Sequence, residues 1–211
     1  MKNSIALNTL LGVAAMALPL IATAESNYQT GNGTLSATAH VDFTIVVPRT
    51  LYLRVGTGSA YTTGALTANT AVDLITFTPA LATLGSGTAV AGTGGDLTGG
   101  VETAAIMTNS SAVSLTATAT GALTDGNANT IAFTQITTAA TALTGTYTLL
   151  PAPVLANGVS TPVTLTAAAN KTITADAKWT YSYANAAVVP AGTYGGVNTN
   201  NSRVVYTATV L

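Results

Sequence analysis

Apolar and polar residues alternate with a period of two along most of the chain, which predicts strands and not helices. The longest alternating run is TLSATAHVDFTIVV, from Thr34 to Val47. Its odd-numbered positions are apolar, and its even-numbered positions up to Thr44 are polar. A strand with this pattern buries one face, either in its own domain or in a neighbouring molecule. The alternation by itself leaves both possibilities open.

Gly- and Asn-rich turns separate most of the alternating segments. The candidate strands are Leu35–Val47, Leu51–Val55, Val72–Thr78, Val113–Ala119, Ile131–Ile136, Tyr147–Leu150, Val163–Thr166, Ala177–Tyr183 and Val204–Val210. The clearest core-facing sets are Val113, Leu115, Ala117 and Ala119; Ala177, Trp179, Tyr181 and Tyr183; and Val204, Tyr206, Ala208 and Val210. Eight or nine short strands favour an all-β fold, and a two-sheet sandwich over a barrel.

Two kinds of segment depart from this pattern. Gly85–Gly100 carries many glycines and predicts a long surface loop that could be mobile. Ala139, Ala140, Ala142 and Ala167–Ala169 have high helix propensity. Since threonines and turn residues surround these alanines, we expect short helical turns there at most.

The beginning of the chain has the three parts of a secretory signal peptide. Lys2 precedes the mostly apolar stretch Ile5–Ile21, and Ala22-Thr23-Ala24 ends it with small residues. A membrane anchor is the alternative, but the break at Pro19 and the small-residue ending favour cleavage. We therefore expect residues 1–24 to be removed, a secreted mature chain that begins at Glu25, and no membrane association after cleavage.

The composition is unusually poor in charge. Charged residues make up 6% of the chain, against roughly 25% in ordinary globular proteins. The formal net charge is −1 and cysteine is absent. Without a basic patch, nucleic acid is not an expected partner. A surface with few charges is poorly protected against association of sheet edges, so either partners cover it or association is its purpose.

The residues do not form a convincing catalytic set. A single histidine, His40, and no cysteine argue against triads and zinc sites, and His40 is expected to be solvated or hydrogen-bonded. Asp96 and Glu102 flank the glycine-rich loop and are the remaining candidates for hydrolysis. A glycosidase needs rigidly held carboxyl groups, and a glycine-rich loop does not predict rigidity. We expect no enzymatic activity, no metal and no cofactor.

Aromatic residues suggest a second kind of site. Trp179, Tyr181 and Tyr183 could form a platform for sugar rings. Alternation places them on one face of a strand, where aromatic rings supply much of a sandwich core. Core packing is the favoured interpretation.

Four stretches resemble a known family. They are GTLSATAHVDFTIVV at the mature N-terminus; AVDLITFTPA at 71–80; IMTNSSAVSLTATATG at 106–121; and VPAGTYGG at 189–196, which precedes the final segment RVVYTATVL. They are similar to chaperone–usher pilins, namely the cysteine-free subunits of the alternate, colonisation-factor class and the archaic, spore-coat-U-like class. The long Gly85–Gly100 loop, the NTNN insertion and the lack of a disulfide depart from the family pattern. A closely related donor-strand-exchange filament subunit is therefore the alternative.

This resemblance implies an incomplete immunoglobulin-like sandwich that a donated strand completes. Residues 25–43 would be the donor extension and residues 44–211 the pilin-like domain. The donor residues would be Leu35, Ala37, Ala39, Val41 and Phe43. The acceptor groove would be lined by Val204, Tyr206, Ala208 and Val210.

The implied function is a structural subunit of an extracellular bacterial fimbrium that serves adhesion or biofilm formation. Its partners would be further copies of itself in a head-to-tail homopolymer, a periplasmic chaperone and an outer-membrane usher. Two other hypotheses remain open at this stage. One is a monomeric secreted β-sandwich binding module, such as a lectin-like adhesin, and the other is a secreted hydrolase that uses Asp96 and Glu102.

Overall fold

The structure is a computed structural model that describes residues 26–58, 66–168 and 171–211. The chain divides into two units, residues 1–47 and residues 48–211, and each is described by itself. The predicted signal peptide, residues 1–24, lies outside the described residues.

The described residues contain strands, two short 3₁₀ turns and no α-helix, so the all-β prediction is confirmed. The strands are β1 (Leu51–Val55), β2 (Ile75–Thr76), β3 (Val90–Ala91), β4 (Thr93–Gly94), β5 (Val101–Thr108), β6 (Ala112–Ala119), β7 (Leu123–Thr124), β8 (Thr130–Ile131), β9 (Ile136–Thr141), β10 (Thr148–Leu149), β11 (Val163–Thr166), β12 (Ile173–Tyr183) and β13 (Val204–Val210). The 3₁₀ turns are Leu81–Thr83 and Phe133–Gln135. A helix suited to crossing a membrane is not found in the described ranges.

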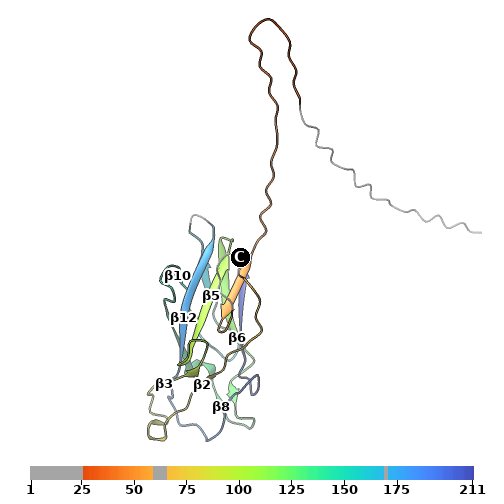
Figure 1. The fold of residues 1–211 in the computed structure, drawn as a ribbon. Coiled ribbons are helices and arrows are strands. Elements are labelled where there is room, and N and C mark those ends of the chain that lie inside the picture. The colour runs from red at the N-terminus through yellow and green to blue at the C-terminus, as the bar shows by residue number, and fades with distance from the viewer. Residues whose placement is uncertain (1–25, 59–65, 169–170) are drawn as a thin grey trace, which may run out of the picture. The chain divides into compact units, whose positions relative to one another are not determined.

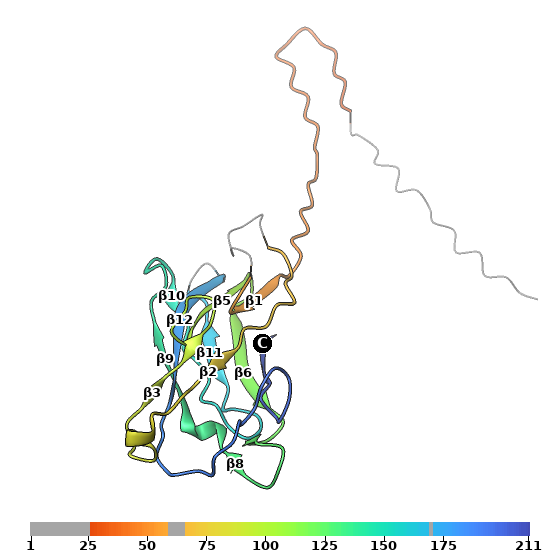
Figure 2. The ribbon, with the colours of Figure 1, turned by 60° about the horizontal axis from the view of Figure 1, so that its bottom comes forward.

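Two main sheets organise residues 48–211. In the larger sheet, β5 lies between β1 and β12, and β12 also pairs with β10, β9 and β3 (Figure 1). In the smaller sheet, β6 lies between β11 and β13. Two short pairs, β2 with β4 and β7 with β8, and an isolated bridge between Thr118 and Val159 complete the described pairing. Figure 2 labels β6 and β11 of the smaller sheet together with β1, β5, β9 and β12 of the larger sheet.

One hydrophobic core draws side chains from both sheets. Two of the three predicted core-facing sets are buried as expected: the alternate residues of β6, from Val113 to Ala119, and those of β12, from Ala177 to Tyr183. Trp179 is fully buried, and its indole N–H donates a hydrogen bond of 2.9 Å to the backbone oxygen of Leu150. The core interpretation of these aromatic residues is therefore confirmed. The third set, on β13, is only half-buried.

The sequence pattern missed β5, the strand at the centre of the larger sheet. Ala104, Ala105 and Ile106 follow one another along β5, and all three are fully buried. A strand that is buried on both faces reads as a continuous apolar run, so the period of two disappears. Alternation therefore detects half-exposed strands better than central ones.

Other strand and helix predictions were wrong or only partly right. Of the predicted strand Val72–Thr78, only Ile75–Thr76 (β2) is a strand. Ala139 and Ala140, expected in a short helical turn at most, lie in β9 and pair with Thr180 and Trp179 of β12. This backbone pairing overrides the helix propensity of alanine. The predicted strand Ile131–Ile136 is instead interrupted, since β8 ends at Ile131 and a 3₁₀ turn follows.

The segment Gly85–Gly100 is a surface segment with many turns, as predicted, but it also contains β3 and β4. Its first part is held by Asn185, which is fully buried. The Asn185 side chain accepts a hydrogen bond from the backbone N–H of Gly85 (2.9 Å) and donates one to the oxygen of Thr83 (2.7 Å). These bonds oppose the mobility that its glycines predicted.

Residues 26–47 are described as an extended segment without strand pairing. The strand predicted at Leu35–Val47 is therefore not found in the described chain. Apolar side chains of this segment are exposed: Val41 by 74% and Phe43 by 88%. An alternating pattern specifies two faces, but a strand also needs a partner for its backbone groups.

Replacing Trp179 tests the core. Trp179→Ala should lower the free energy of unfolding by about 3–5 kcal/mol, because it removes a large buried ring and leaves a cavity. Urea denaturation measures this change. Lys178→Ala, at an exposed position on the same strand, should change stability by no more than about 0.5 kcal/mol. Equal effects of the two substitutions would contradict the core assignment.

Candidate functional site: an open flank between β1 and β13

Each main sheet ends in a strand with one unpaired edge at the same side of the molecule. Among the described residues, β1 pairs only with β5 and β13 pairs only with β6. The two edge strands contact each other across the sheets, and Figures 1 and 2 show β1 beside the C-terminal strand. Unpaired edges present backbone N–H and C=O groups that need a hydrogen-bonding partner. We call this side the open flank, formed by β1 and β13.

The apolar face of β13 is poorly covered at the open flank. Val204, Tyr206, Ala208 and Val210 are all half-buried. Their direct neighbours on β6, from Val113 to Ala119, are buried almost completely. On the other side of the flank, Leu53 and Val55 of β1 also pack against the core while remaining half-buried. The core is thus closed over β6 and open toward the edges of β1 and β13.

Tyr206 is held firmly in the floor of the open flank. Its hydroxyl group lies 2.8 Å from the hydroxyl group of Tyr181. Its ring packs against Trp179, with 5.3 Å between ring centroids and planes tilted by 45°. Burial raises the pKa of Tyr206 to about 12, so its phenol is neutral at physiological pH. The position of Tyr206 is therefore set by the core behind it.

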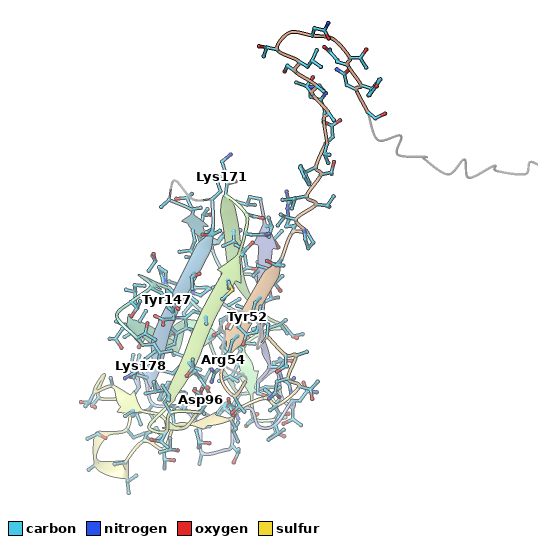
Figure 3. All side chains as sticks on the ribbon, turned by 45° about the horizontal axis from the view of Figure 1, so that its top comes forward. Tyr52, Arg54, Asp96, Tyr147, Lys171 and Lys178 are labelled. Carbon is cyan, nitrogen blue, oxygen red and sulfur yellow. The ribbon has the colours of Figure 1, made fainter. Side chains whose placement is uncertain are left out.

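A buried polar cluster fixes the end of β1. The Arg54 guanidinium Nη2 lies 2.9 Å from Asp96 Oδ2, and Nε donates to the backbone oxygen of Gly56 (2.8 Å). Figure 3 shows Arg54 and Asp96 approaching each other at this end of the sheet. Asp96 Oδ1 also accepts a hydrogen bond from the backbone N–H of Thr103 (2.7 Å). One carboxylate thus connects the glycine-rich loop to β1 and β5.

Glu102 and Asp73 complete the cluster. Glu102 Oε2 accepts a hydrogen bond from the backbone N–H of Asp96 at 3.2 Å. Burial raises the pKa of Glu102 to about 8; this backbone hydrogen bond opposes the rise, and the charges of Asp73 and Asp96 add to it. Partial burial alone would raise the pKa of Asp73, but hydrogen bonds from the Thr57 backbone and hydroxyl lower it below its usual value. Glu102 is therefore protonated at neutral pH beside an ionised Asp73.

Space is tight around this cluster. A Cβ atom added at Gly56 would lie 2.3 Å from Asp73 Oδ2 and 2.8 Å from Glu102 Oε2. Gly56 also has a φ of +81°, a conformation that disfavours other residues. The turn after β1 thus depends on glycine for two separate reasons.

The structure brings together the two carboxyl groups that the sequence suggested for hydrolysis. Asp96 and Glu102 are connected through the Asp96 backbone, and both side chains are largely buried. The expectation that their loop would be too flexible to hold them was wrong, because hydrogen bonds and an ion pair fix it. The same contacts occupy both carboxylate oxygens of Asp96 and Oε2 of Glu102 in holding the loop. Sequence reasoning missed Arg54 and Asp73, which are distant along the chain and belong to no recognisable motif.

The remaining predicted residues lie as follows. The donor residues Leu35, Ala37, Ala39, Val41 and Phe43 are in the exposed segment 26–47, together with His40. The acceptor residues are those of β13 at the open flank. Metal-binding groups of three or more His, Cys, Asp or Glu residues are not found in the described part of the chain.

No protein-family model, curated protein or solved structure matches the chain.

The pKa of Glu102 predicts a dependence of stability on pH. Its value is about 8 in the folded protein and 4.5 in a free side chain, so the stabilising contribution of the protonated group is complete below pH 4.5 and is lost as the pH rises toward 8. We expect the free energy of unfolding to fall by at least about 1 kcal/mol over this range, since one unit of pKa difference is worth about 1.4 kcal/mol.

Chemical denaturation of the wild type and Glu102→Gln at several pH values measures this effect. The substituted amide side chain cannot ionise, so the decline should become shallower in that variant. Lys178→Ala, at an exposed position on β12 outside the donor segment, should keep the wild-type decline. An unchanged decline in Glu102→Gln would contradict the assignment to Glu102.

Proposed function

We propose that the protein is a structural subunit of an extracellular fibre, in which residues 35–43 of one copy fill the open flank of the next. The observation that carries this proposal is the half-buried apolar face of β13 beside an unpaired strand edge. A strand inserted there would satisfy backbone groups and cover apolar side chains in one step.

The exposed N-terminal segment supplies a matching element. Its apolar residues Leu35, Ala37, Ala39, Val41 and Phe43 alternate with polar residues, as an edge strand with one buried face requires. An extended backbone of this length spans about 30 Å, which suffices to cover β13. Exposed apolar side chains such as Phe43 favour burial in a partner.

The order of strands also supports an immunoglobulin-like sandwich with a vacant edge. Immunoglobulin-like domains place their strands A, B, E and D in one sheet and C, F and G in the other. In this proposal β1, β5 and β12, followed by β9 and β10, correspond to the order A-B-E-D. β6 and β13 then correspond to C and F, with β11 as an additional strand on the other edge of β6. The place of strand G, beside β13, has no strand among the described residues.

Such a contact joins two different surfaces of the same protein, so it extends into a fibre and does not close into a dimer. Removing the strand would expose the apolar flank again, which would make each joint kinetically long-lived. By resemblance, the proposal includes a periplasmic chaperone that covers the flank before assembly and an outer-membrane usher. It places the assembled fibre outside the cell, in adhesion or biofilm formation.

Two adjacent substitutions in the full-length protein test the donor role. Ala39→Glu places a charge on the apolar face of the segment, and Thr38→Glu places the same charge on the polar face. We expect Ala39→Glu to reduce thread formation at least tenfold, because a buried unpaired carboxylate is strongly unfavourable. Thr38→Glu should assemble at close to the wild-type level.

Negative-stain microscopy of material sheared from producing cells, with mass spectrometry of the threads, measures the outcome. Deleting residues 25–43 should abolish extension. Normal threads from Ala39→Glu or from the deletion would refute the proposal. A soluble monomer that binds glycans and never assembles would instead support the lectin-like alternative.

A further inference from the structure

We propose one specific register for this contact: the segment of one copy lies antiparallel to β13 of the next, with Asp42 facing Arg203. This inference rests on the proposed function and goes beyond it by assigning a register and a specificity-determining ion pair. The partner is a second copy of this chain.

The alternation of both segments limits the registers that are possible. The apolar residues of the donor segment have odd numbers, and the half-buried residues of β13 have even numbers. Only pairings of odd with even positions keep both apolar faces toward the core. In the proposed register the inward pairs are Leu35 with Val210, Ala37 with Ala208, Ala39 with Tyr206, and Val41 with Val204.

Charge selects among these registers. Arg203 immediately precedes β13 and is half-buried, while Asp42 is exposed. Neither side chain has a hydrogen bond or ion pair within the described ranges. The proposed register places the two directly opposite each other on the outer face. Because the chain has only 6 Lys and Arg residues and 7 Asp and Glu residues, such a match distinguishes this register from its neighbours.

A parallel arrangement separates the same charges. With the apolar pairs running from Leu35 beside Val204 to Val41 beside Val210, Asp42 would lie opposite Leu211. It would then be roughly 25 Å from Arg203, at about 3.3 Å for each residue. Opposite charges on facing strands stabilise a pair by about 0.2–1 kcal/mol, and only the antiparallel arrangement obtains this contribution.

The size of Tyr206 separates the proposed register from one neighbour. Tyr206 is fixed by Tyr181 and Trp179 and has little freedom to move aside. The proposed register places the small Ala39 opposite this large ring. A shift of two residues in one direction would place the larger Val41 there. A shift in the other direction places Ala37 there, but it also puts His40 and not Asp42 opposite Arg203.

Engineered disulfides test the register directly, because the chain contains no cysteine. In the proposed register Thr38 faces Thr207, both on the outer face. Directly opposed residues on paired strands have Cα atoms about 4.5–5.5 Å apart, which suits a disulfide. We expect the full-length double variant Thr38→Cys with Thr207→Cys to form covalent dimers, trimers and longer species on non-reducing gels, and reductant should remove them.

Two matched controls represent the neighbouring registers. Thr38→Cys combined with Thr209→Cys or with Val205→Cys places the second cysteine two positions along β13, where crosslinking should be at least tenfold weaker. A stronger ladder from either control would overturn the register while leaving the proposed function intact. Threads without a ladder in any variant would overturn the placement beside β13. Disulfides that form only within single molecules would overturn both the register and the proposed function. The absence of threads in every variant would do the same.

Charge exchange tests the ion pair separately. Asp42→Arg and Arg203→Asp should each speed the dissociation of threads in denaturant, by about twofold to fivefold for each joint, which corresponds to about 0.4–1 kcal/mol for one cross-strand pair. The double exchange should restore the wild-type rate. Independent, additive losses in the double variant would overturn the pairing of Asp42 with Arg203.

Discussion

The structure depends on a hydrophobic core that its two sheets cover unequally. Over β6 the inner side chains are almost completely buried, whereas one strand away, on β13, they are half-buried beside an unpaired backbone edge. At this edge apolar side chains are incompletely buried, and backbone N–H and C=O groups lack hydrogen-bonding partners. One additional strand would bury the side chains and pair the backbone groups together. The open flank formed by β1 and β13 therefore combines incomplete burial with unpaired strand edges.

Two sets of contacts hold the flank in shape. Trp179 and Tyr181 support Tyr206 from within the core, and Trp179 is itself fixed by the oxygen of Leu150. At the end of β1, Arg54 and Asp96 join the glycine-rich loop to the larger sheet. An edge strand without a second neighbour requires such support, because half of its backbone groups are unpaired within the sheet. The flank is therefore organised before any strand enters it.

Because the chain has few charged residues, each charged contact matters more to the fold and to the proposed joint. With so few ionisable side chains, most polar contacts in the described chain involve threonine, serine, asparagine and the backbone. Of the buried carboxyl groups, Asp96 joins the glycine-rich loop to Arg54 of β1, and Glu102 holds the backbone of the same loop at Asp96. In the proposed fibre, the ion pair of Asp42 with Arg203 would fix the direction and register of the donated strand beside β13. The other contacts of this joint are apolar and would allow the strand to shift its register.

Sequence alternation by itself determined the all-β class, the bounds of β1, β11 and β13, and the inward faces of β6 and β12. These features are local, because a half-buried strand records its two environments in adjacent residues. Only the tertiary structure decided the rest. Burial on both faces concealed β5, pairing with β12 turned an alanine-rich segment into β9, and Asn185 and Arg54 ordered a loop whose glycines suggested mobility. Each of these outcomes depends on contacts between residues distant along the chain, which no local pattern specifies.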